Sequence, residues 1–299
     1  MQYHSLGRTG LQVSEIGFGG APAGLRNYLG VWEPENADAE QLIIEAIQKA
    51  FALGINYFDT APAYGDGASE RMFGRAIHPF RQQVAIATKS GFTKKEAVLR
   101  SAEASLERLQ VETIDVLQLH GGWYSDEQAK EILGPGGALE GLQELRRQGL
   151  VRFIGFTTEG ANGAASQLIA SGEFDVVQCC YNLIYQHPYD PSRQAGLMFE
   201  AEARQMGIIT MRSLTSGIFQ QWFEMVFGAD LLDLRGADHR PYRARLQEAL
   251  LSFVLSNPLV DTALVGMRSA AEASDNAAIC ENLALRIDLD QLHERYVKR

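Results

Sequence analysis

Apolar, strand-like runs alternate with amphipathic, helix-like segments along nearly the whole chain, and this alternation restricts the possible folds most strongly. Eight runs have the length and composition of buried strands: Glu15–Gly20, Ile55–Thr60, Val84–Lys89, Ile114–His120, Val151–Thr157, Phe174–Cys179, Gly207–Arg212 and Thr262–Gly266. Most are followed by a plausible helix, such as Asp38–Leu53, Lys95–Leu109, Ala138–Gln148 or Pro191–Met206. Strands that are apolar on both faces and separated by helices indicate a parallel sheet. Eight such units favour an α/β fold of the (β/α)8 TIM-barrel type over an open sheet.

Two segments lie outside this repeating pattern. The opening QYHSLGRTGLQVS carries a turn signal from Gly7 to Gly10 and predicts a short N-terminal β-hairpin. The stretch Ser213–Pro241 fits no strand–helix unit, yet it contains Trp222, Phe223 and Phe227. Long connections within a compact domain are usually lids or binding loops, so we expect long loops on the C-terminal face. Because no linker or low-complexity tract interrupts the chain, one domain spanning residues 1–299 is expected.

Composition excludes several classes of partner. The formal net charge of −10 and the isoelectric point near 5.2 argue against binding to nucleic acid or to an anionic membrane. No run approaches the roughly 20 apolar residues that span a bilayer, and the N-terminus does not resemble a signal peptide. With three cysteines and no CxxC motif, a disulfide framework is not expected. We therefore expect a cytoplasmic protein that is a monomer or a small homo-oligomer.

Ionisable residues stand at the ends of three consecutive predicted strands. Asp59 ends the second strand, Lys89 the third and His120 the fourth, while Tyr64 lies in the loop after Asp59. The carboxyl ends of barrel strands face a shared cleft, so these four side chains are expected to converge.

The chemistry that suits this set is proton donation to a carbonyl oxygen. The phenol of tyrosine has a pKa of about 10, and a nearby lysine is expected to lower it by stabilising the phenolate. A carboxylate beside the lysine fixes its position, and a histidine orients the substrate oxygen or assists proton transfer. Taken singly, each residue is more often a cap, a solvated group or a packing residue; the joint pattern favours catalysis.

Two long motifs resemble the aldo-keto reductase superfamily: GINYFDTAPAYG with GASERMFGRAI (Gly54–Ile77) and LRRQGLVRFIGFT (Leu145–Thr157). The similarity runs from the hairpin to about Asn282. It implies a catalytic tetrad of Asp59, Tyr64, Lys89 and His120, with Tyr64 as proton donor. It also implies NAD(P)H-dependent reduction of a small aldehyde or ketone, with the cofactor extended across the barrel mouth. No metal ligand set is expected.

The resemblance also implies cofactor contacts along the strand ends. Gln178 matches the glutamine that binds the nicotinamide carboxamide, and Thr157 stands where the family usually has serine. Met211, followed by Arg212, replaces an aromatic residue that often stacks on the nicotinamide ring. Gly20, in the GFGG run, is interpreted as a point of close backbone approach to cofactor or substrate. The expected cofactor contacts are Gly20, Asp59, Thr157, Gln178, Met211, Arg212, Gly266, Arg268, Glu272 and Asn276.

The segment GMRSAAEASDN (Gly266–Asn276) corresponds to the adenosine end of the cofactor site. Two of its charged residues favour different cofactors. Arg268 is able to hold a 2′-phosphate, whereas the carboxylate of Glu272 repels one and accepts from a free 2′-hydroxyl. We expect NADPH, with NADH or dual use as the alternative. Glu272 is equally well interpreted as a solvated residue in the first turn of a helix.

Substrate contacts are expected from three loops that carry aromatic residues. These are the loop after the first strand with Tyr28 and Trp32, the loop after the fourth with Trp123 and Tyr124, and the segment with Trp222. They suggest a largely apolar pocket above the tetrad.

The main alternative is a cofactor-binding regulatory or scaffold protein on the same barrel. A metal-dependent hydrolase would need converging histidines such as an HxH pair, which is absent, and a Schiff-base aldolase leaves Asp59 and Tyr64 without a role.

Overall fold

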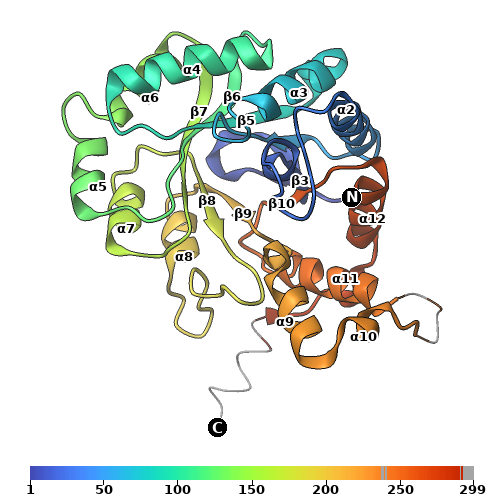
Figure 1. Cartoon of the computed structure of the whole chain (residues 1–299). Coiled ribbons are helices and arrows are strands. Elements are labelled where there is room, and N and C mark those ends of the chain that lie inside the picture. The colour runs from blue at the N-terminus through green and yellow to red at the C-terminus, as the bar shows by residue number, and fades with distance from the viewer. Residues whose placement is uncertain (237–238, 240, 290, 292–299) are drawn as a thin grey trace.

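The computed structural model describes residues 1–236, 239, 241–289 and 291. Within them, eight parallel strands close into a barrel (Figure 1). The barrel strands are β3 (Ile16–Gly19), β4 (Tyr57–Asp59), β5 (Ala85–Ser90), β6 (Ile114–Leu119), β7 (Val151–Thr158), β8 (Val176–Cys180), β9 (Gly207–Met211) and β10 (Thr262–Gly266). Each pairs with the next along the chain, and β10 closes the ring against β3. The predicted (β/α)8 barrel is confirmed.

Helices fill the connections and surround the strands (Figure 1). They are α1 (Ala21–Gly24), α2 (Ala37–Ala52), α3 (Ala68–Ile77), η2 (His78–Gln83), α4 (Lys95–Leu109), α5 (Asp126–Leu133), α6 (Ala138–Arg147), α7 (Gly163–Ala170), α8 (Leu197–Glu202), η3 (Thr215–Gly217), α9 (Ile218–Phe227), α10 (Ala229–Asp233), α11 (Tyr242–Leu255), α12 (Ala270–Glu281) and η4 (Leu283–Leu285). In α2, Ile43, Ala46, Ile47 and Ala50 are buried at helical spacing, which explains why this segment packs as an amphipathic helix.

The N-terminal hairpin closes the bottom of the barrel. Strands β1 (Tyr3–Ser5) and β2 (Gln12–Ser14) pair antiparallel, as predicted, with the short helix η1 (Gly7–Thr9) between them. Leu6 and Val13 are fully buried and pack with residues of the barrel interior. The carboxylate of Asp261 accepts from the backbone N–H groups of Gly7 and Ile208, at 3.2 and 2.9 Å. The hairpin therefore leaves the C-terminal face as the open end.

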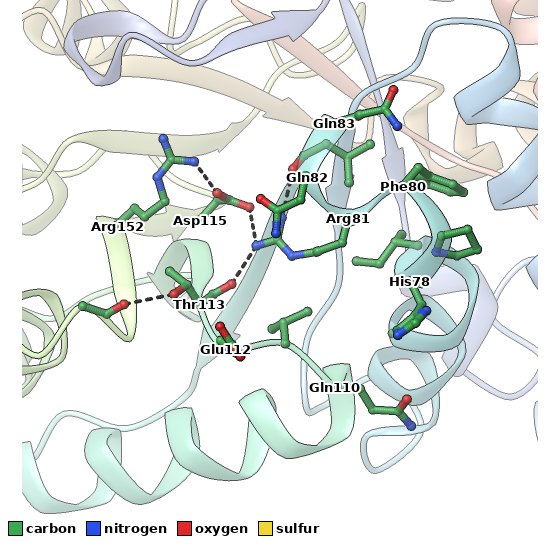
Figure 2. Close-up of a pocket in the computed structure, with 16 residues that line it drawn as sticks. His78, Phe80, Arg81, Gln82, Gln83, Gln110, Glu112, Thr113, Asp115 and Arg152 are labelled. Atoms are coloured by element: carbon green, nitrogen blue, oxygen red, sulfur yellow. Dashed lines mark hydrogen bonds and ion pairs between the residues drawn. The ribbon is translucent and has the colours of Figure 1, made fainter.

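A polar cavity of about 770 Å³ lies near the starts of β5, β6 and β7, on the closed face. Figure 2 shows that Asp115 at its wall lies between two arginines. Its carboxylate is 2.8 Å from Arg81 Nη2 and 2.6 Å from Arg152 Nη1, and it accepts from the Ile86 N–H at 2.9 Å. These contacts join three neighbouring strands, so we interpret this cavity as part of the structural face of the barrel.

Two predicted segments differ from the structure. The predicted helix Pro191–Met206 is shortened to α8, because Gln194 and Gly196 have φ of +49° and +109° and break the helix before Leu197. The stretch Ser213–Pro241 contains η3, α9 and α10; residues 237, 238 and 240 lie outside the described residues. Figure 1 shows α9 and α10 gathered beside α11, at the rim of the molecule.

Candidate active site

Alternate side chains on the barrel strands form an apolar interior that becomes polar toward the open face. Tyr57 on β4 and Ala87 on β5 belong to the inner apolar cluster. Because side chains two positions apart share a face of a strand, the next inward residues are Asp59 and Lys89. The same step on β8 leads from Val176 to Gln178. A two-residue period thus places polar groups in one layer above a packed floor.

Lys89 is fully buried and held by two acceptors. Its Nζ lies 2.5 Å from Oδ2 of Asp59 and 2.8 Å from the carbonyl oxygen of Thr60. Asp59 is itself buried, and burial raises the pKa of its carboxyl against the opposing attraction of Lys89. Burial also acts to lower the pKa of Lys89, but Asp59 and Tyr64 together raise it. Lys89 therefore stays a cation, and Asp59 fixes its position.

Tyr64 and His120 approach this pair from the loops above it. Nζ of Lys89 lies 5.1 Å from the centroid of the Tyr64 ring. The rings of Tyr64 and His120 meet edge to face, with centroids 5.7 Å apart and an interplanar angle of 87°. The structure thus brings all four sequence-predicted tetrad residues together, although Tyr64 and His120 come from separate loops.

The expected lowering of the Tyr64 pKa is wrong in its net direction. Burial raises the pKa of the phenol by more than the Lys89 cation lowers it. The physical reason is that a phenolate in this cleft would lose its hydration. The attraction of the Lys89 cation, which is already paired with Asp59, does not make up for that loss. Tyr64 is consequently protonated over the whole neutral range, which suits a proton donor.

The imidazole of His120 is neutral at physiological pH. Its removal from water, followed by repulsion from Lys89, lowers the pKa of His120 from 6.5 to about 4. A neutral imidazole donates one hydrogen bond and accepts another. A neutral imidazole at this position is suited to hydrogen bonding and has no proton to supply as an acid near neutral pH.

Gln118 is a site residue that the sequence reasoning missed. It lies on β6, is fully buried, and its Nε2 donates to Asp59 Oδ1 at 3.3 Å and to Gln178 Oε1 at 3.0 Å. It thereby connects the tetrad carboxylate to the glutamine expected at the nicotinamide. A polar residue within the apolar run IDVLQLH, two positions before His120, was the available signal.

A pocket of about 830 Å³ opens on the C-terminal face and extends from the tetrad to the start of α12. Asp59, Tyr64 and His120 line one part of it, and Arg268, Glu272 and Asn276 line another. Of the expected cofactor contacts, those on its wall are Asp59, Thr157, Gln178, Met211, Arg212, Gly266, Arg268, Glu272 and Asn276. This volume lies within the usual range for small-molecule and cofactor sites.

The residues present are chemically suited to a dinucleotide. Among the described residues, the acceptor for Gln178 Nε2 is Sδ of Met211 at 3.6 Å, a weak partner that a carboxamide oxygen would replace favourably. Thr157 Oγ1 already accepts a hydrogen bond from the Gly121 N–H and donates one to the Gly121 carbonyl. Asn276 Oδ1 already accepts one from Gln247 Nε2.

At the far end, Arg268 and Glu272 organise the start of α12. The carboxylate of Glu272 accepts from the backbone N–H of Arg268 at 2.6 Å, and its own N–H donates to Ser269 Oγ at 3.2 Å. Glu272 is exposed, so it is both a capping residue and a charge on the pocket wall. The guanidinium of Arg268 donates to the Leu29 carbonyl at 2.9 Å and lies over the Trp32 ring.

Several predicted contacts lie elsewhere. Gly20 is packed beneath the pocket wall, where a Cβ would come within 2.9 Å of the Asp59 carbonyl oxygen; Gly19 lines the pocket instead. Trp32 supports Arg268 and donates to the Ala23 carbonyl. Trp123 is 68% exposed, and Tyr124 is buried against Phe156. None of these three aromatic residues, nor Trp222, lines the pocket, because their loops turn them toward packing or solvent; Tyr28 does line it.

The described residues provide neither a metal-binding cluster nor a membrane-spanning helix. No group of three or more His, Cys, Asp and Glu residues within the described ranges is arranged to hold a metal ion. Among the helices built from described residues, none combines the length and apolarity needed to cross a membrane. The three cysteines, Cys179, Cys180 and Cys280, are buried and free.

A barrel that carries a tyrosine, a lysine and a histidine at its open mouth, beside a dinucleotide-sized pocket, defines a class of carbonyl oxidoreductases. The sequence model of the Aldo/keto reductase family matches residues 15–292. The chain therefore belongs to the aldo/keto reductase family, whose members are NAD(P)H-dependent oxidoreductases.

Individual relatives agree with this assignment. The chain is 29% identical to the L-galactose dehydrogenase of Arabidopsis thaliana over 98% of its own length and 93% of that protein. In fold it is similar to the holo form of aldo-keto reductase AKR11C1 from Bacillus halodurans, with a TM-score of 0.71, 24% identity and coverage of 94% and 91% of the two chains. A Klebsiella pneumoniae aldo-keto reductase in complex with NADPH gives a TM-score of 0.71 at 22% identity, covering 99% and 96%.

Proposed function

We propose that this protein reduces the carbonyl group of a small aldehyde or ketone, with Tyr64 donating the proton. The observation that supports the proposal best is the buried Asp59–Lys89 pair beside a protonated Tyr64 and a neutral His120. When bound, NAD(P)H supplies the hydride that the carbonyl carbon receives. The pocket residues suited to hold it are Gln178, Met211, Arg268 and Asn276.

Each tetrad residue then has a separate task. Tyr64 gives its proton to the carbonyl oxygen, so that the product is an alcohol and a phenolate remains. Lys89 stabilises that phenolate, because a cation beside a developing anion in a cleft of low dielectric lowers its energy. Asp59 keeps Lys89 in place, and His120 donates a hydrogen bond that orients the carbonyl oxygen.

The test compares wild type with Tyr64→Phe, measuring initial rates of NADPH and NADH oxidation with 4-nitrobenzaldehyde. We expect Tyr64→Phe to lose at least roughly 100-fold in kcat, the usual magnitude for a general acid. Cofactor affinity, measured by quenching of protein fluorescence, should stay nearly unchanged, because the phenol acts on the substrate. Tyr3→Phe is the matched control, since the Tyr3 hydroxyl contacts the Gly54 carbonyl, outside the pocket.

The possible outcomes separate the two candidate functions. Full activity of Tyr64→Phe would remove Tyr64 from the mechanism. Cofactor binding by the wild-type protein without oxidation of either nucleotide would favour the regulatory or scaffold alternative.

A further inference from the structure

An ion pair of unexpected placement lies on the wall of the same pocket. Nη2 of Arg212 lies 2.5 Å from Oε1 of Glu159, and both side chains are about one-third exposed, at 33% and 35%. Both residues line the pocket together with Tyr64 and His120. Glu159 has no assigned role in the proposed reaction, and Arg212 was expected to contact the cofactor.

The topology places this pair across the mouth of the barrel. Glu159 is the first residue after β7 and Arg212 is the first after β9, while β8 lies between these two strands. The pair therefore spans the end of β8, two residues beyond Gln178. Cys180, the last residue of β8, is close enough for both charges to act on its pKa, which burial raises to about 11.

The backbone on both sides holds the pair in position. The N–H of Glu159 donates to the Gly122 carbonyl at 2.8 Å, two residues beyond His120. The carbonyl of Arg212 accepts from Asn182 Nδ2 at 2.9 Å and from the Thr215 N–H at 2.7 Å. Arg212 has a φ of +58°, a left-handed conformation that is unfavourable for a residue with a side chain. Such conformations persist where the surroundings impose them, and they concentrate at functional sites.

The two charged groups on this pocket wall point to a class of substrate. Of the expected aromatic residues, Tyr28 alone lines the described part of this pocket. The carboxylate of Glu159 and the guanidinium of Arg212 add an acceptor and a donor group side by side. Because the pair has no net charge, it does not select for a charged substrate. A hydroxyl group is complementary to both members, since it donates to Glu159 and accepts from Arg212. An apolar substrate would instead remove water from both charged groups without offering them a hydrogen bond, which is unfavourable.

We propose that Glu159 and Arg212 form a polar clamp that selects small hydroxylated aldehydes or ketones, with hydroxyl groups on carbons next to the carbonyl. This inference rests on the proposed carbonyl reduction and assigns its substrate class. A site that hydrogen-bonds a substrate hydroxyl discriminates against the analogue that lacks it. Because the pair is partly exposed, the discrimination is smaller here than at a fully buried site.

The experiment measures the ratio of kcat/KM for glyceraldehyde to kcat/KM for propanal in wild type, Glu159→Ala, Arg212→Ala and the double variant. The hydrated fraction of each aldehyde is the same for every variant, so a change in the ratio reports the protein alone. We expect each single variant to lower the ratio about tenfold, the effect of one lost hydrogen bond. Glu131→Ala, which breaks the exposed Lys94–Glu131 pair, is the control and should leave the ratio unchanged.

Reduction of 4-nitrobenzaldehyde keeps the two proposals distinguishable. If wild type fails to reduce any of these aldehydes, the proposed function fails and the clamp falls with it. If the variants still reduce 4-nitrobenzaldehyde while their ratios stay within about twofold of wild type, the clamp alone is wrong. A fall in Tm without a change in the ratio would assign the pair a structural role. If Arg212→Ala harms glyoxylate reduction more than glyceraldehyde reduction, the arginine serves a carboxylate, and the hydroxylated class is wrong.

Discussion

The ammonium of Lys89 lies 2.5 Å from the carboxylate of Asp59, and neither side chain is more than 3% exposed. Two opposite charges that share so little contact with water depend on each other. Removing one leaves the other buried without a counter-charge, which costs far more than the loss of a surface ion pair. The same contact therefore contributes to the stability of the barrel and, in the proposed reaction, to the chemistry at its mouth.

Lys89→Met is expected to lower the free energy of unfolding by roughly 3–5 kcal/mol, because it leaves the Asp59 carboxylate buried and unpaired. Urea denaturation measures this change. Lys95→Met breaks the Lys95–Glu144 pair, which lies at the surface and is screened by water, and should lower the free energy of unfolding far less. Equal losses in the two variants would contradict the dependence on burial.

The rate of carbonyl reduction should be nearly constant between about pH 5 and 8. Burial lowers the pKa of His120 to about 4 and raises the pKa of Tyr64, so neither group changes its charge in this range. The pH profile of kcat/KM with 4-nitrobenzaldehyde tests this expectation. A midpoint near pH 6.5 that disappears in His120→Gln would show that the histidine titrates normally.

The lowered pKa of His120 also predicts how stability depends on pH. The unfolded chain binds this proton near the ordinary value of 6.5, whereas the folded chain binds it near 4. As the pH falls from 6.5 toward 4, protonation of His120 therefore favours the unfolded chain. The stability of His120→Gln relative to wild type should rise over this interval and stay constant above pH 7, as measured by urea denaturation. A difference that does not vary with pH would oppose the shift.

Gln118→Leu should weaken both stability and catalysis. The substitution removes the hydrogen bonds to Asp59 Oδ1 and Gln178 Oε1 and leaves two buried acceptors with one fewer donor. We expect a loss of about 1–3 kcal/mol in unfolding free energy and about a tenfold fall in kcat/KM. Gln143→Leu, which removes a side-chain contact to Glu173 on the outer ring, is the control. Activity like that of wild type would show that the bridge through Gln118 does not position the tetrad.

Glu272→Gln should shift the cofactor preference toward NADPH. The amide oxygen still accepts from the Arg268 N–H, so the start of α12 is preserved while a negative charge is removed from the pocket wall. We expect the ratio of the NADPH to the NADH dissociation constant, measured by fluorescence titration, to fall about threefold to tenfold. Glu281→Gln, at the other end of α12, serves as the control. An unchanged ratio would mean that Glu272 acts only as a capping residue.

The sequence was sufficient to predict the barrel because its strands are apolar on both faces and regularly spaced. It also placed Asp59, Lys89 and His120 together, since strand order in such a barrel follows chain order. The directions in which the side chains of the loops point could not be predicted from the sequence. Trp32, Trp123 and Tyr124 are aromatic residues in the right loops, but packing against Arg268, Gly160 and Phe156 directs them away from the pocket.

The Glu159–Arg212 pair could not be predicted for a related reason. It joins two strand ends separated by 53 positions in the chain, and it forms with Arg212 in a left-handed conformation that no local pattern indicates. The net direction of the Tyr64 pKa depended likewise on a balance between burial and charge that only three-dimensional placement determines. Long-range contacts and burial thus account for most of what the sequence left open.

The segment that carries α9 and α10 is attached to the molecule in a distinctive way. No residue of α9 is buried, and Arg243 on α11 holds it through Glu224 on α9 and Asp233 on α10. The barrel core therefore does not depend on the packing of α9, whereas Leu214 packs against the core and Leu232 on α10 is buried. Ser213, Leu214, Ser216, Gly217 and Gln220 contribute to the pocket wall. A helix attached in this way can be exchanged at little cost to the folding of the barrel, so that the rim of the pocket is adjustable while the packed floor beneath it stays the same.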